Sequence, residues 1–409
     1  MIKLALIGAG KRGWDLAMLA RQLPEPAFVT VIVDPEPEAV RQRINTQDSN
    51  NNSIMFFKDI DSFMQSGINC DGVIIASRCS THTDLALRVA TLNKPIFLEK
   101  PVAINTVQLQ SLWQSSLMHR QNVVVSFPLR LTPLFQAVQQ IVASGRLGKI
   151  NQIQAYNNVA YGGVYFGQWY RQVSEAGGLW LQKATHDFDY INALIGARPL
   201  EIAATGTRAV YGGQRPCNLK CSQCPDTATC LESPIAHRQR QDDGGMAYGK
   251  PGDDHACAFS ECIVNDDASS ALILYEGGVH ATYTQNFISR RSAGRRGAIV
   301  TGYQATLIFN WTGGASQIIS HFDRDVETLD VPPAIGGHDG GDAALLRNFI
   351  NVIHGREASR CSLAEGVVSA AMCLAATRSA ATHTFQSITL DEKSLSTHQT
   401  GEPAGAPLH

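Results

Sequence analysis

The sequence predicts an α/β fold in residues 1–125 followed by an α+β fold in residues 126–409. Three observations support this division. An apolar run, Leu4–Ile7, ends in a glycine-rich turn close to the N-terminus. Residues 1–125 alternate apolar strands with helices, which is typical of a parallel sheet covered on both faces. From Lys149 onwards short strands dominate, which indicates a large, mostly antiparallel sheet.

The glycine-rich turn reads GAGKRG and lies between a strand and a helix. Glycine suits a sharp turn, a close approach of the backbone to a pyrophosphate, and the tight packing of helix on strand. The helix that follows points its free N–H groups and its positive end toward the phosphates. We therefore predict a Rossmann domain in which Gly8, Gly10, Lys11, Arg12 and Gly13 bind a dinucleotide, against the alternative of a turn that holds no ligand.

An acidic residue ends the second strand of this domain. Asp34 follows the strand Phe28–Val33 and lies 34 − 13 = 21 residues after Gly13, close to the spacing of about 20 in dinucleotide-binding domains. A carboxylate at this position accepts hydrogen bonds from ribose hydroxyls and repels a 2′-phosphate. The sequence therefore predicts NAD(H) rather than NADP(H), although the nearby Arg41 and Arg43 favour NADP(H).

The rest of the first domain continues the alternation. The expected helices cover residues 36–43, 60–65, 80–92 and 106–120, and the expected strands cover 54–57, 70–77, 95–98 and 123–126. In such folds the ligand lies in the crevice outside the carboxyl ends of the strands. Ser77 and Arg78, at one of these ends, are therefore candidates for cofactor contacts.

Glu99, Lys100 and Pro101 follow the next strand of the same sheet. Pro101 stiffens the backbone and is a candidate for a cis peptide bond that would direct Lys100. The ammonium of Lys100 would bind the nicotinamide ribose and a substrate hydroxyl, and would lower the pKa of that hydroxyl. We predict Glu99 and Lys100 at the cofactor and a catalytic role for Lys100; the alternative is a solvated Glu-Lys loop.

A second polar group lies in the segment GGLWLQKATHDFD, residues 177–189. Gln182, His186 and Asp189 recur at helical spacing and share one face, with Lys183 beside them. Histidine is the usual group for removing a hydroxyl proton near neutral pH, and a carboxylate can orient its ring. We predict catalytic roles for His186, Gln182 and Lys183, against the alternative of a structural histidine on a helix.

The second domain is expected to contain helices at residues 131–144, 179–195, 342–354 and 362–384, and strands at 150–159, 200–210, 256–264, 270–276, 279–286, 297–300 and 305–309. The tail after Asp391 has few apolar residues and is expected to be loose. An aromatic-rich segment, residues 161–171, suits the apolar faces of a sugar, while the alternative is a packed strand and turn. The predicted substrate contacts are Arg130, Tyr161, Tyr165, Trp169, Arg171, His186 and His338.

Four cysteines lie within a polar insertion at about residues 211–250. Cys217, Cys221, Cys224 and Cys230 have the spacing C-x3-C-x2-C-x5-C. Four thiolates can surround one tetrahedral zinc ion, and such a site would order the insertion. We predict structural zinc; iron–sulfur ligation and four reduced thiols are the alternatives.

Composition and charge restrict the class of protein. The net charge is −2 and the pI is near 6.6, so no basic field for nucleic acid or anionic membranes is expected. No run of about 18 apolar residues is present, and the first apolar run lacks the features of a signal peptide. Ten cysteines, of which only four are bunched, indicate a reducing cytoplasm.

The motifs GAGKRG, Asp34, LEKP and GG(x)7HDFD, in this order, resemble those of the glucose–fructose oxidoreductase / inositol dehydrogenase / rhizopine catabolism family (Gfo/Idh/MocA), over nearly the whole chain. The resemblance implies a Rossmann domain and a mainly β domain whose open sheet often mediates homo-oligomers, here a dimer or tetramer. It also implies Lys100 as the active-site lysine, His186 as general acid/base and His82 near the cofactor. Many members carry an aspartate where this chain has Gln182, with Lys183 beside it.

These patterns predict an NAD-dependent dehydrogenase that oxidises a hydroxyl of a sugar, sugar derivative or cyclitol, or reduces the corresponding ketone. Its partner would be a small carbohydrate. One alternative is a glycoside hydrolase that retains NAD and uses transient oxidation. The other is a non-catalytic regulator that binds sugar or NAD.

Overall fold

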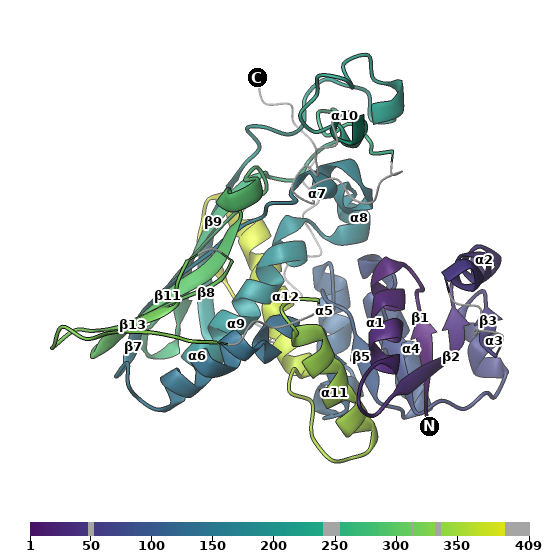
Figure 1. Cartoon of the computed structure of the whole chain (residues 1–409), viewed down its shortest axis with the longest axis horizontal. Coiled ribbons are helices and arrows are strands. Elements are labelled where there is room, and N and C mark those ends of the chain that lie inside the picture. The colour runs from purple at the N-terminus through teal and green to yellow at the C-terminus, as the bar shows by residue number, and fades with distance from the viewer. Residues whose placement is uncertain (48–52, 240–253, 313, 332–336, 389–409) are drawn as a thin grey trace.

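The structure is a computed structural model that describes residues 1–47, 53–239, 254–312, 314–331 and 337–388. Two sheets lie at opposite sides of the molecule, with helices packed between them (Figure 1). The predicted order of an α/β part followed by an α+β part is confirmed. The tail after Asp391 lies outside the described residues.

The first sheet is six-stranded and entirely parallel, in the order β3-β2-β1-β4-β5-β6. Its strands are β1 (Ile2–Ile7), β2 (Ala27–Val33), β3 (Met55–Phe57), β4 (Gly72–Ile75), β5 (Ile96–Leu98) and β6 (Val123–Val125). β4, β5 and β6 are buried throughout, as expected for strands covered on both faces. The strand order reverses between β1 and β4, and such switch points open a crevice at the carboxyl ends of the strands.

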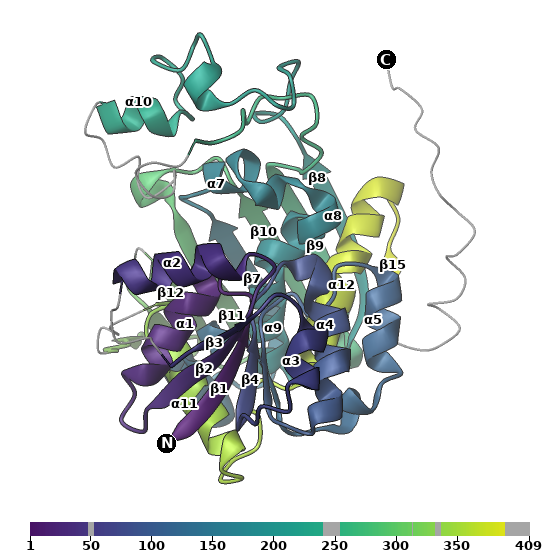
Figure 2. The same ribbon diagram turned by 90° about the vertical axis from the view of Figure 1, so that its right-hand side faces the viewer.

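Helices cover both faces of this sheet (Figure 2). They are α1 (Lys11–Arg21), α2 (Pro37–Gln47), α3 (Ile60–Gln65), α4 (His82–Val89) and α5 (Thr106–Trp113), with 3-10 turns η1 (Cys79–Thr81), η2 (Ala90–Leu92) and η3 (Ser116–His119). Asp59 and Asn105 cap α3 and α5 by accepting backbone N–H bonds. The predicted helix at residues 106–120 is shorter than expected, because α5 ends at Trp113 and a 3-10 turn follows.

The second sheet is nine-stranded, in the order β14-β13-β12-β11-β7-β10-β9-β8-β15. All of its pairings are antiparallel except that of β7 with β10 at its centre. Its strands are β7 (Ile150–Asn158), β8 (Pro199–Thr207), β9 (Ala268–Tyr275), β10 (His280–Asn286), β11 (Arg295–Gly302), β12 (Ala305–Thr312), β13 (Gln317–Ser320), β14 (Val326–Thr328) and β15 (Gln386–Ser387). This confirms the predicted large and mostly antiparallel sheet.

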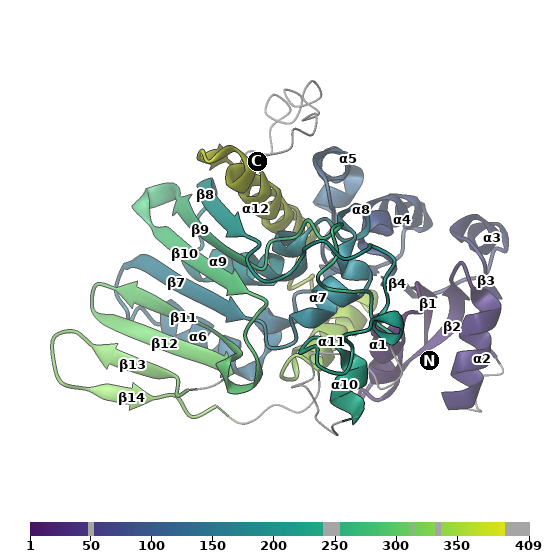
Figure 3. The same ribbon diagram turned by 90° about the horizontal axis from the view of Figure 1, so that it is seen from above.

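Long helices fill the space between the sheets (Figure 3). They are α6 (Pro133–Ala143), α9 (Thr185–Ile195), α11 (Gly341–Ile353) and α12 (Leu363–Thr382). α12 contacts β8 and α9 on the side of the large sheet, and α5 and β6 on the other. Its N-terminus has a capping box, in which Ser362 and Glu365 each bond the other's backbone N–H. Its alanine-rich sequence lets the neighbouring elements approach closely.

Short turns connect these elements. They are η4 (Pro128–Leu131), α7 (Gly163–Gly167), η5 (Trp169–Arg171), α8 (Val173–Ala176), the π-helical turn η6 (Trp180–Ala184), η7 (Cys221–Gln223), α10 (Pro234–Gln239), η9 (Glu276–Gly278) and η10 (Arg291–Ala293). The predicted strand at 256–264 is wrong, because this segment is a loop whose Ala258 and Ile263 pack against Phe287 in a second apolar cluster. β13, β14 and β15 were not predicted. Among the helices that the structure describes, none has the length and apolar character of a transmembrane span.

Candidate active site

The glycine-rich turn has the shape of a phosphate cradle. Gly8 has a φ of +85°, and a Cβ there would lie 2.5 Å from Cα of Ser77. A Cβ on Gly13 would lie 2.2 Å from the carbonyl oxygen of Gly8, so α1 can pack on β1 only with glycine at this position. Gly10, by contrast, faces open space, and no side chain caps the helix that starts at Lys11. The open backbone and the free helix N-terminus fit a pyrophosphate.

Asp34 is held against this turn by two backbone groups. Its carboxylate accepts hydrogen bonds from the N–H of Ala9 at 2.9 Å and the N–H of Glu36 at 3.1 Å. Arg43, from α2, donates to the carbonyl oxygen of Ala9, so a cation also lies at this rim. Lys11 is exposed and pairs with Asp15 one helical turn later. Asp34, which favours NAD, and Arg43, which favours NADP, therefore both lie beside the turn.

A cavity of about 210 Å³ opens next to the turn, at the carboxyl ends of β4 and β5. It is lined by Arg12, Ala76, Ser77, Cys79, His82, Glu99, Lys100, Ser126, Tyr161, Tyr165, Trp169, Tyr170, Gln182, Lys183, His186 and His338. Most residues predicted from the two motifs and the aromatic segment are thus brought together. A larger hollow of about 600 Å³ lies between Asn93, Arg120 and Glu357, away from these motifs, and contains none of the predicted site residues.

Arg12 is engaged with protein carboxylates rather than free for a phosphate. Its Nε donates to Glu99 at 2.7 Å, and its two terminal nitrogens donate to Asp342 at 2.8 and 2.7 Å. Burial would raise the pKa of Glu99, but the charges of Arg12 and Lys100 and the hydrogen bonds from Arg12 and Ser126 bring that pKa below its usual value. Arg12 therefore positions Glu99 and Asp342 at the rim of the cavity, and its contact with a cofactor stays a prediction.

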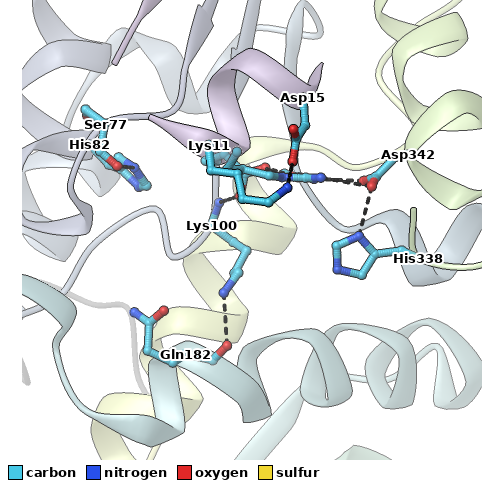
Figure 4. Close-up of polar contacts among 11 residues, drawn as sticks. Lys11, Asp15, Ser77, His82, Lys100, Gln182, His338 and Asp342 are labelled. Carbon is cyan, nitrogen blue, oxygen red and sulfur yellow. Dashed lines mark hydrogen bonds and ion pairs between the residues drawn. The ribbon is translucent and has the colours of Figure 1, made fainter. Parts of the chain in front are cut away.

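Lys100 reaches across the cavity from the first sheet (Figure 4). Its Nζ donates to the backbone carbonyl of Gln182 at 2.9 Å, and its peptide bond to Pro101 is cis, as the sequence suggested. Burial lowers the pKa of Lys100, and Lys183 lowers it further, against opposing contributions from Cys79 and Glu99. The ammonium of Lys100 therefore loses its proton more readily than that of an exposed lysine does.

His82 ties two loops of the cavity together. Its ring nitrogens lie 2.9 Å from the carbonyl oxygen of Pro101 and 3.3 Å from that of Ser77. Burial lowers the pKa of this histidine. It joins the ends of β4 and β5, where the cofactor crevice is expected.

Gln182 and His186 are separated by a change in helix type. Gln182 lies in the π-helical turn η6, and its amide donates to the carbonyl of Ala176 at 2.7 Å and to Sγ of Cys79 at 3.4 Å. His186 is 6% exposed, and its Nδ1 has no hydrogen-bond partner among the described residues. Burial lowers its pKa well below the usual value, and the charge of Lys100 adds to this effect. His186 is thus a neutral imidazole near pH 7.

Lys183 points into the cavity next to two tyrosines. Its Nζ donates to the hydroxyl of Tyr161 and lies 4.2 Å from the ring centroid of Tyr161 and 5.1 Å from that of Tyr165. Burial raises the pKa of Tyr161, but the charge and hydrogen bond of Lys183, followed by Arg296 and Lys100, outweigh it and the net shift is downward. The pKa of Tyr165 is raised, chiefly by burial.

Two predicted substrate contacts lie outside the cavity. Arg130 pairs with Asp189 at 3.2 Å and Glu365 at 2.7 Å, which fixes the start of α12. Arg171 is buried and donates to the carbonyl of Cys257 at 3.2 Å, where it supports the insertion. The structure therefore does not bring Arg130 and Arg171 to the cavity, and their contacts with substrate stay predictions from the sequence. Carbohydrate-binding arginine and structural arginine look alike in sequence.

Arg78, which the sequence predicts at the cofactor, contacts an aromatic side chain. Its guanidinium lies 4.1 Å from the ring centroid of Trp169, which does line the cavity. Trp169 itself stacks on Tyr170, with ring centroids 4.0 Å apart. The aromatic segment thus forms one wall of the cavity, and Arg78 supports that wall.

The cysteines do not have the predicted arrangement. A small cavity in the insertion is lined by Cys221, Cys224, Cys230 and Cys257. Cys217 lies instead against Cys262. The loop at 256–264 brings Cys257 and Cys262, which were not among the predicted ligands, to the insertion. Within the described ranges, no group of three or more His, Cys, Asp or Glu side chains is placed to hold a metal ion. The structure therefore does not bring the four predicted cysteines together as a zinc or iron–sulfur site.

Sequence reasoning missed several residues around the cavity. Asp342 and Ser126 bind Arg12, and Tyr170 and Cys79 line the wall. Asp342 lies four residues after His338 in GGHDGGD, and His338 Nδ1 lies 2.9 Å from its carboxylate (Figure 4). No helical pattern signalled this contact, because His338 precedes α11, which begins at Gly341. For Ser126 no motif was available.

Comparison with known families agrees with this architecture. A model described as oxidoreductase family, NAD-binding Rossmann fold, matches residues 2–127, and a model of the GFO/IDH/MocA C-terminal domain matches residues 135–308. The chain belongs to the Gfo/Idh/MocA family of oxidoreductases. The resemblance inferred from the motifs is therefore confirmed. This Gfo/Idh/MocA protein has the NAD(P)-binding Rossmann domain that defines the family's cofactor site.

Individual relatives of this Gfo/Idh/MocA chain are distant. The YteT protein of Bacillus subtilis (strain 168) is 25% identical over 334 residues, which are 72% of this chain and 78% of YteT. Inositol 2-dehydrogenase of Rhizobium meliloti (strain 1021) is 26% identical over 148 residues, or 35% of this chain and 42% of that enzyme. A solved levoglucosan dehydrogenase, in complex with NADH and levoglucosan, superposes with a TM-score of 0.72 over 95% of this chain and 99% of its own. At 19% identity, that likeness shows the fold.

Proposed function

We propose that this Gfo/Idh/MocA oxidoreductase is an NAD-dependent dehydrogenase that acts on a hydroxyl of a sugar, a sugar derivative or a cyclitol. One observation carries the proposal. Lys100, His186 and the Lys183–Tyr161 pair converge on one cavity that adjoins the glycine-rich turn. The named activities of the inositol and levoglucosan dehydrogenases support the substrate class.

The residues that would hold the dinucleotide follow from the shape of the crevice. The turn from Gly8 to Gly13 and the N-terminus of α1 would take the pyrophosphate. Asp34 would accept hydrogen bonds from the adenosine ribose, which favours NAD over NADP. Arg43 lies close enough to Ala9 to bind a 2′-phosphate if Asp34 were removed. The bound nicotinamide would supply the hydride acceptor.

Residues of this chain would bind the substrate oxygen and stabilise the charge that develops on it. Lys100 is a buried donor, and its ammonium would stabilise negative charge that develops on the hydroxyl oxygen. His186, which the sequence predicts as the proton acceptor, would accept a hydrogen bond from the hydroxyl as a neutral imidazole. Tyr165 and Trp169 would pack against the apolar face of the ring.

The experiment is a panel of carbohydrates assayed by absorbance of the reduced dinucleotide, with NAD and NADP in parallel. The panel would include myo-inositol and levoglucosan. Lys100→Met should lower kcat at least about 100-fold without loss of NADH binding, because it removes the charge at the reacting oxygen. Lys94→Met is the matched control, since Lys94 precedes β5 by two residues just as Lys100 follows it by two.

Two results would overturn the proposal. One is a wild-type protein that reduces neither dinucleotide with any member of the panel. The other is a Lys100→Met variant with turnover within about threefold of wild type. A preference for NADP over NAD would reject the assignment of Asp34 alone. A domain boundary near residue 125, a dimeric or tetrameric assembly and a cytoplasmic location stay predictions from the sequence.

A further inference from the structure

Resting on the proposed dehydrogenase function, we propose that Tyr161, held by Lys183, takes the proton of the substrate hydroxyl. Both side chains line the cavity that contains Lys100 and His186. Lys183 is 6% exposed and lies in the π-helical turn that precedes His186, while Tyr161 follows β7 and is 36% exposed. The pair therefore joins the two elements that frame the proposed substrate site.

The contact between the two residues is specific. The ammonium of Lys183 donates to the phenol oxygen and also lies 4.2 Å from the Tyr161 ring centroid. Charge-assisted hydrogen bonds of this kind favour the ionised form of the acceptor. An ammonium beside a phenol lowers the energy of the phenolate, and this makes a tyrosine a usable base near neutral pH.

The other polar groups of the cavity are less suited to this step. The amide of Gln182 is used by Ala176 and Cys79, so it is turned away from the reacting space. The carboxylate of Glu99 accepts from Arg12 at 2.7 Å and from Ser126 at 2.8 Å. Neither group is therefore free to accept a substrate proton.

His186 is unsuited for an electrostatic reason. Its buried ring is surrounded by positive charge, principally from Lys100 and Arg296 and also from Lys183. A proton on its ring would create one more buried cation among those already present, which is costly in a medium of low dielectric constant. A proton on the phenolate of Tyr161 instead neutralises an anion. His186 then remains a neutral hydrogen-bond acceptor that orients the substrate.

The proton step balances as follows. The substrate O–H bond breaks and its proton forms a new O–H bond with the phenolate oxygen of Tyr161. The C–H bond on the same carbon breaks with its electron pair, which passes as hydride to the oxidised nicotinamide dinucleotide. The substrate is oxidised to a ketone and the dinucleotide is reduced. Tyr161 returns to phenolate by losing its proton to water through its exposed edge.

The ionisation of Tyr161 depends on groups from several elements. Lys183 faces it from η6, Arg296 from β11 and Lys100 from the end of β5, and all three favour the phenolate. Tyr165 faces it from α7, with ring centroids 6.1 Å apart. Burial opposes the three cations but does not outweigh them, and the pKa of Tyr161 lies below that of a free tyrosine.

The first test reads the ionisation directly. Tyrosinate absorbance near 295 nm is followed from pH 6 to 11 in wild type, Tyr161→Phe, Lys183→Gln and the exposed control Tyr303→Phe. Wild type and the control should both show tyrosinate absorbance below pH 10 that comes from Tyr161. Tyr161→Phe should lack this ionisation, and in Lys183→Gln it should move to higher pH. This readout needs no substrate and no activity.

The second test uses the best carbohydrate of the panel, with NADH binding by fluorescence as the measure of an intact cofactor site. Tyr161→Phe should lower kcat by about 100-fold or more, the usual effect of a general base, and should abolish the acid limb of the profile of kcat/KM against pH. Lys183→Gln, which keeps the phenol, should shift that limb to higher pH. The affinity for NADH should stay within about threefold.

Two outcomes would overturn the role of Tyr161. One is a set of titration curves in which wild type and Tyr161→Phe differ only above pH 10. The other is a Tyr161→Phe variant that retains kcat within about threefold with an unchanged pH profile. A wild-type protein that oxidises no carbohydrate, yet shows the low-pH tyrosinate, would instead reject the dehydrogenase function and with it the proton step. The failures of the two proposals are therefore distinguishable.

Discussion

The guanidinium of Arg12 forms a two-point ion pair with the carboxylate of Asp342, although 330 residues separate them in sequence. The same guanidinium donates to Glu99 after β5, and Asp342 lies 2.9 Å from His338. One arginine of the glycine-rich turn thus fixes the turn, the Glu-Lys-Pro segment and the start of α11 relative to each other. The cofactor crevice and the cavity beside it are therefore held in one arrangement by a charged network.

Removing the charge of Asp342 should destabilise the whole protein. Asp342→Asn leaves the guanidinium of Arg12 with one carboxylate partner, Glu99, instead of two, while the side chain of Arg12 is 32% exposed and recovers some hydration. We expect a loss of about 2–3 kcal/mol in the free energy of unfolding, below the 3–5 kcal/mol of fully buried pairs. Urea unfolding at pH 7 measures it. Asp15→Asn, which affects only the exposed pair with Lys11, should change stability by less than about 0.5 kcal/mol. Equal losses in both variants would contradict this assignment.

The contribution of Asp342 should disappear in acid. Burial would raise its pKa, but the hydrogen bonds from His338 and Arg12 and the charge of Arg12 outweigh it and the pKa is depressed. A depressed pKa stabilises the fold above the unfolded-state value near 4, and the stabilisation is lost as the pH falls below it. The difference in stability between wild type and Asp342→Asn should therefore be fully present at pH 5 and shrink below pH 4. A difference that grows below pH 4 would show that the ion pair is not its source.

The contribution of Asp189 to stability should depend on pH in the opposite direction. Burial raises its pKa to about 7, against the opposing charge of Arg130. Because the folded state holds this proton more tightly than the unfolded state does, the contribution of Asp189 to stability falls as the pH rises from about 4 through about 7. Asp189→Asn stays neutral and still accepts from Arg130, so its stability relative to wild type should increase from pH 5 to pH 8. The exposed Asp84→Asn should show no such trend. Parallel pH profiles for wild type and Asp189→Asn would refute the raised pKa.

Features that depend on residues close in sequence could be predicted, whereas contacts between residues far apart in sequence could not. The turn at Gly8–Gly13, Asp34 and the Lys100 segment were predictable, because each requirement is set within one strand–turn–helix unit. The pairing of Arg12 with Asp342 was not predictable, since a carboxylate 330 residues away has no local signature. Arg130 looked like a substrate contact for the same reason, because its partner Glu365 lies in a helix that the chain forms much later.

The helix that carries His186 shows that sequence spacing alone does not give the direction of each side chain. Helical spacing correctly placed Gln182 and His186 on a continuous helical segment, but the π-helical turn between Trp180 and Ala184 changes where each side chain points. The backbone oxygen of Gln182 faces Lys100, while its amide faces away. No residue type in the segment marks a π-helical turn, so the direction of the Gln182 side chain required the structure.

That direction gives a final prediction for Gln182. Its amide donates to the carbonyl of Ala176 at 2.7 Å in a site where the residue is 2% exposed. Gln182→Glu replaces this donor with a carboxylate that faces the carbonyl oxygen, so two acceptors meet without a proton between them. We expect a loss of about 1–3 kcal/mol in the free energy of unfolding at pH 8, and no gain in kcat.

Acid should rescue this variant in a recognisable way. When the new carboxyl is protonated it can donate to Ala176 again, so the stability of Gln182→Glu should rise as the pH falls from 8 to 5. Gln182→Met has a similar volume and no titratable group, and it should show the same pH dependence as wild type. Urea unfolding of the three proteins at both pH values makes the comparison. A Gln182→Glu protein that matches wild type in stability at pH 8, with raised turnover, would mean that the side chain faces the substrate rather than Ala176.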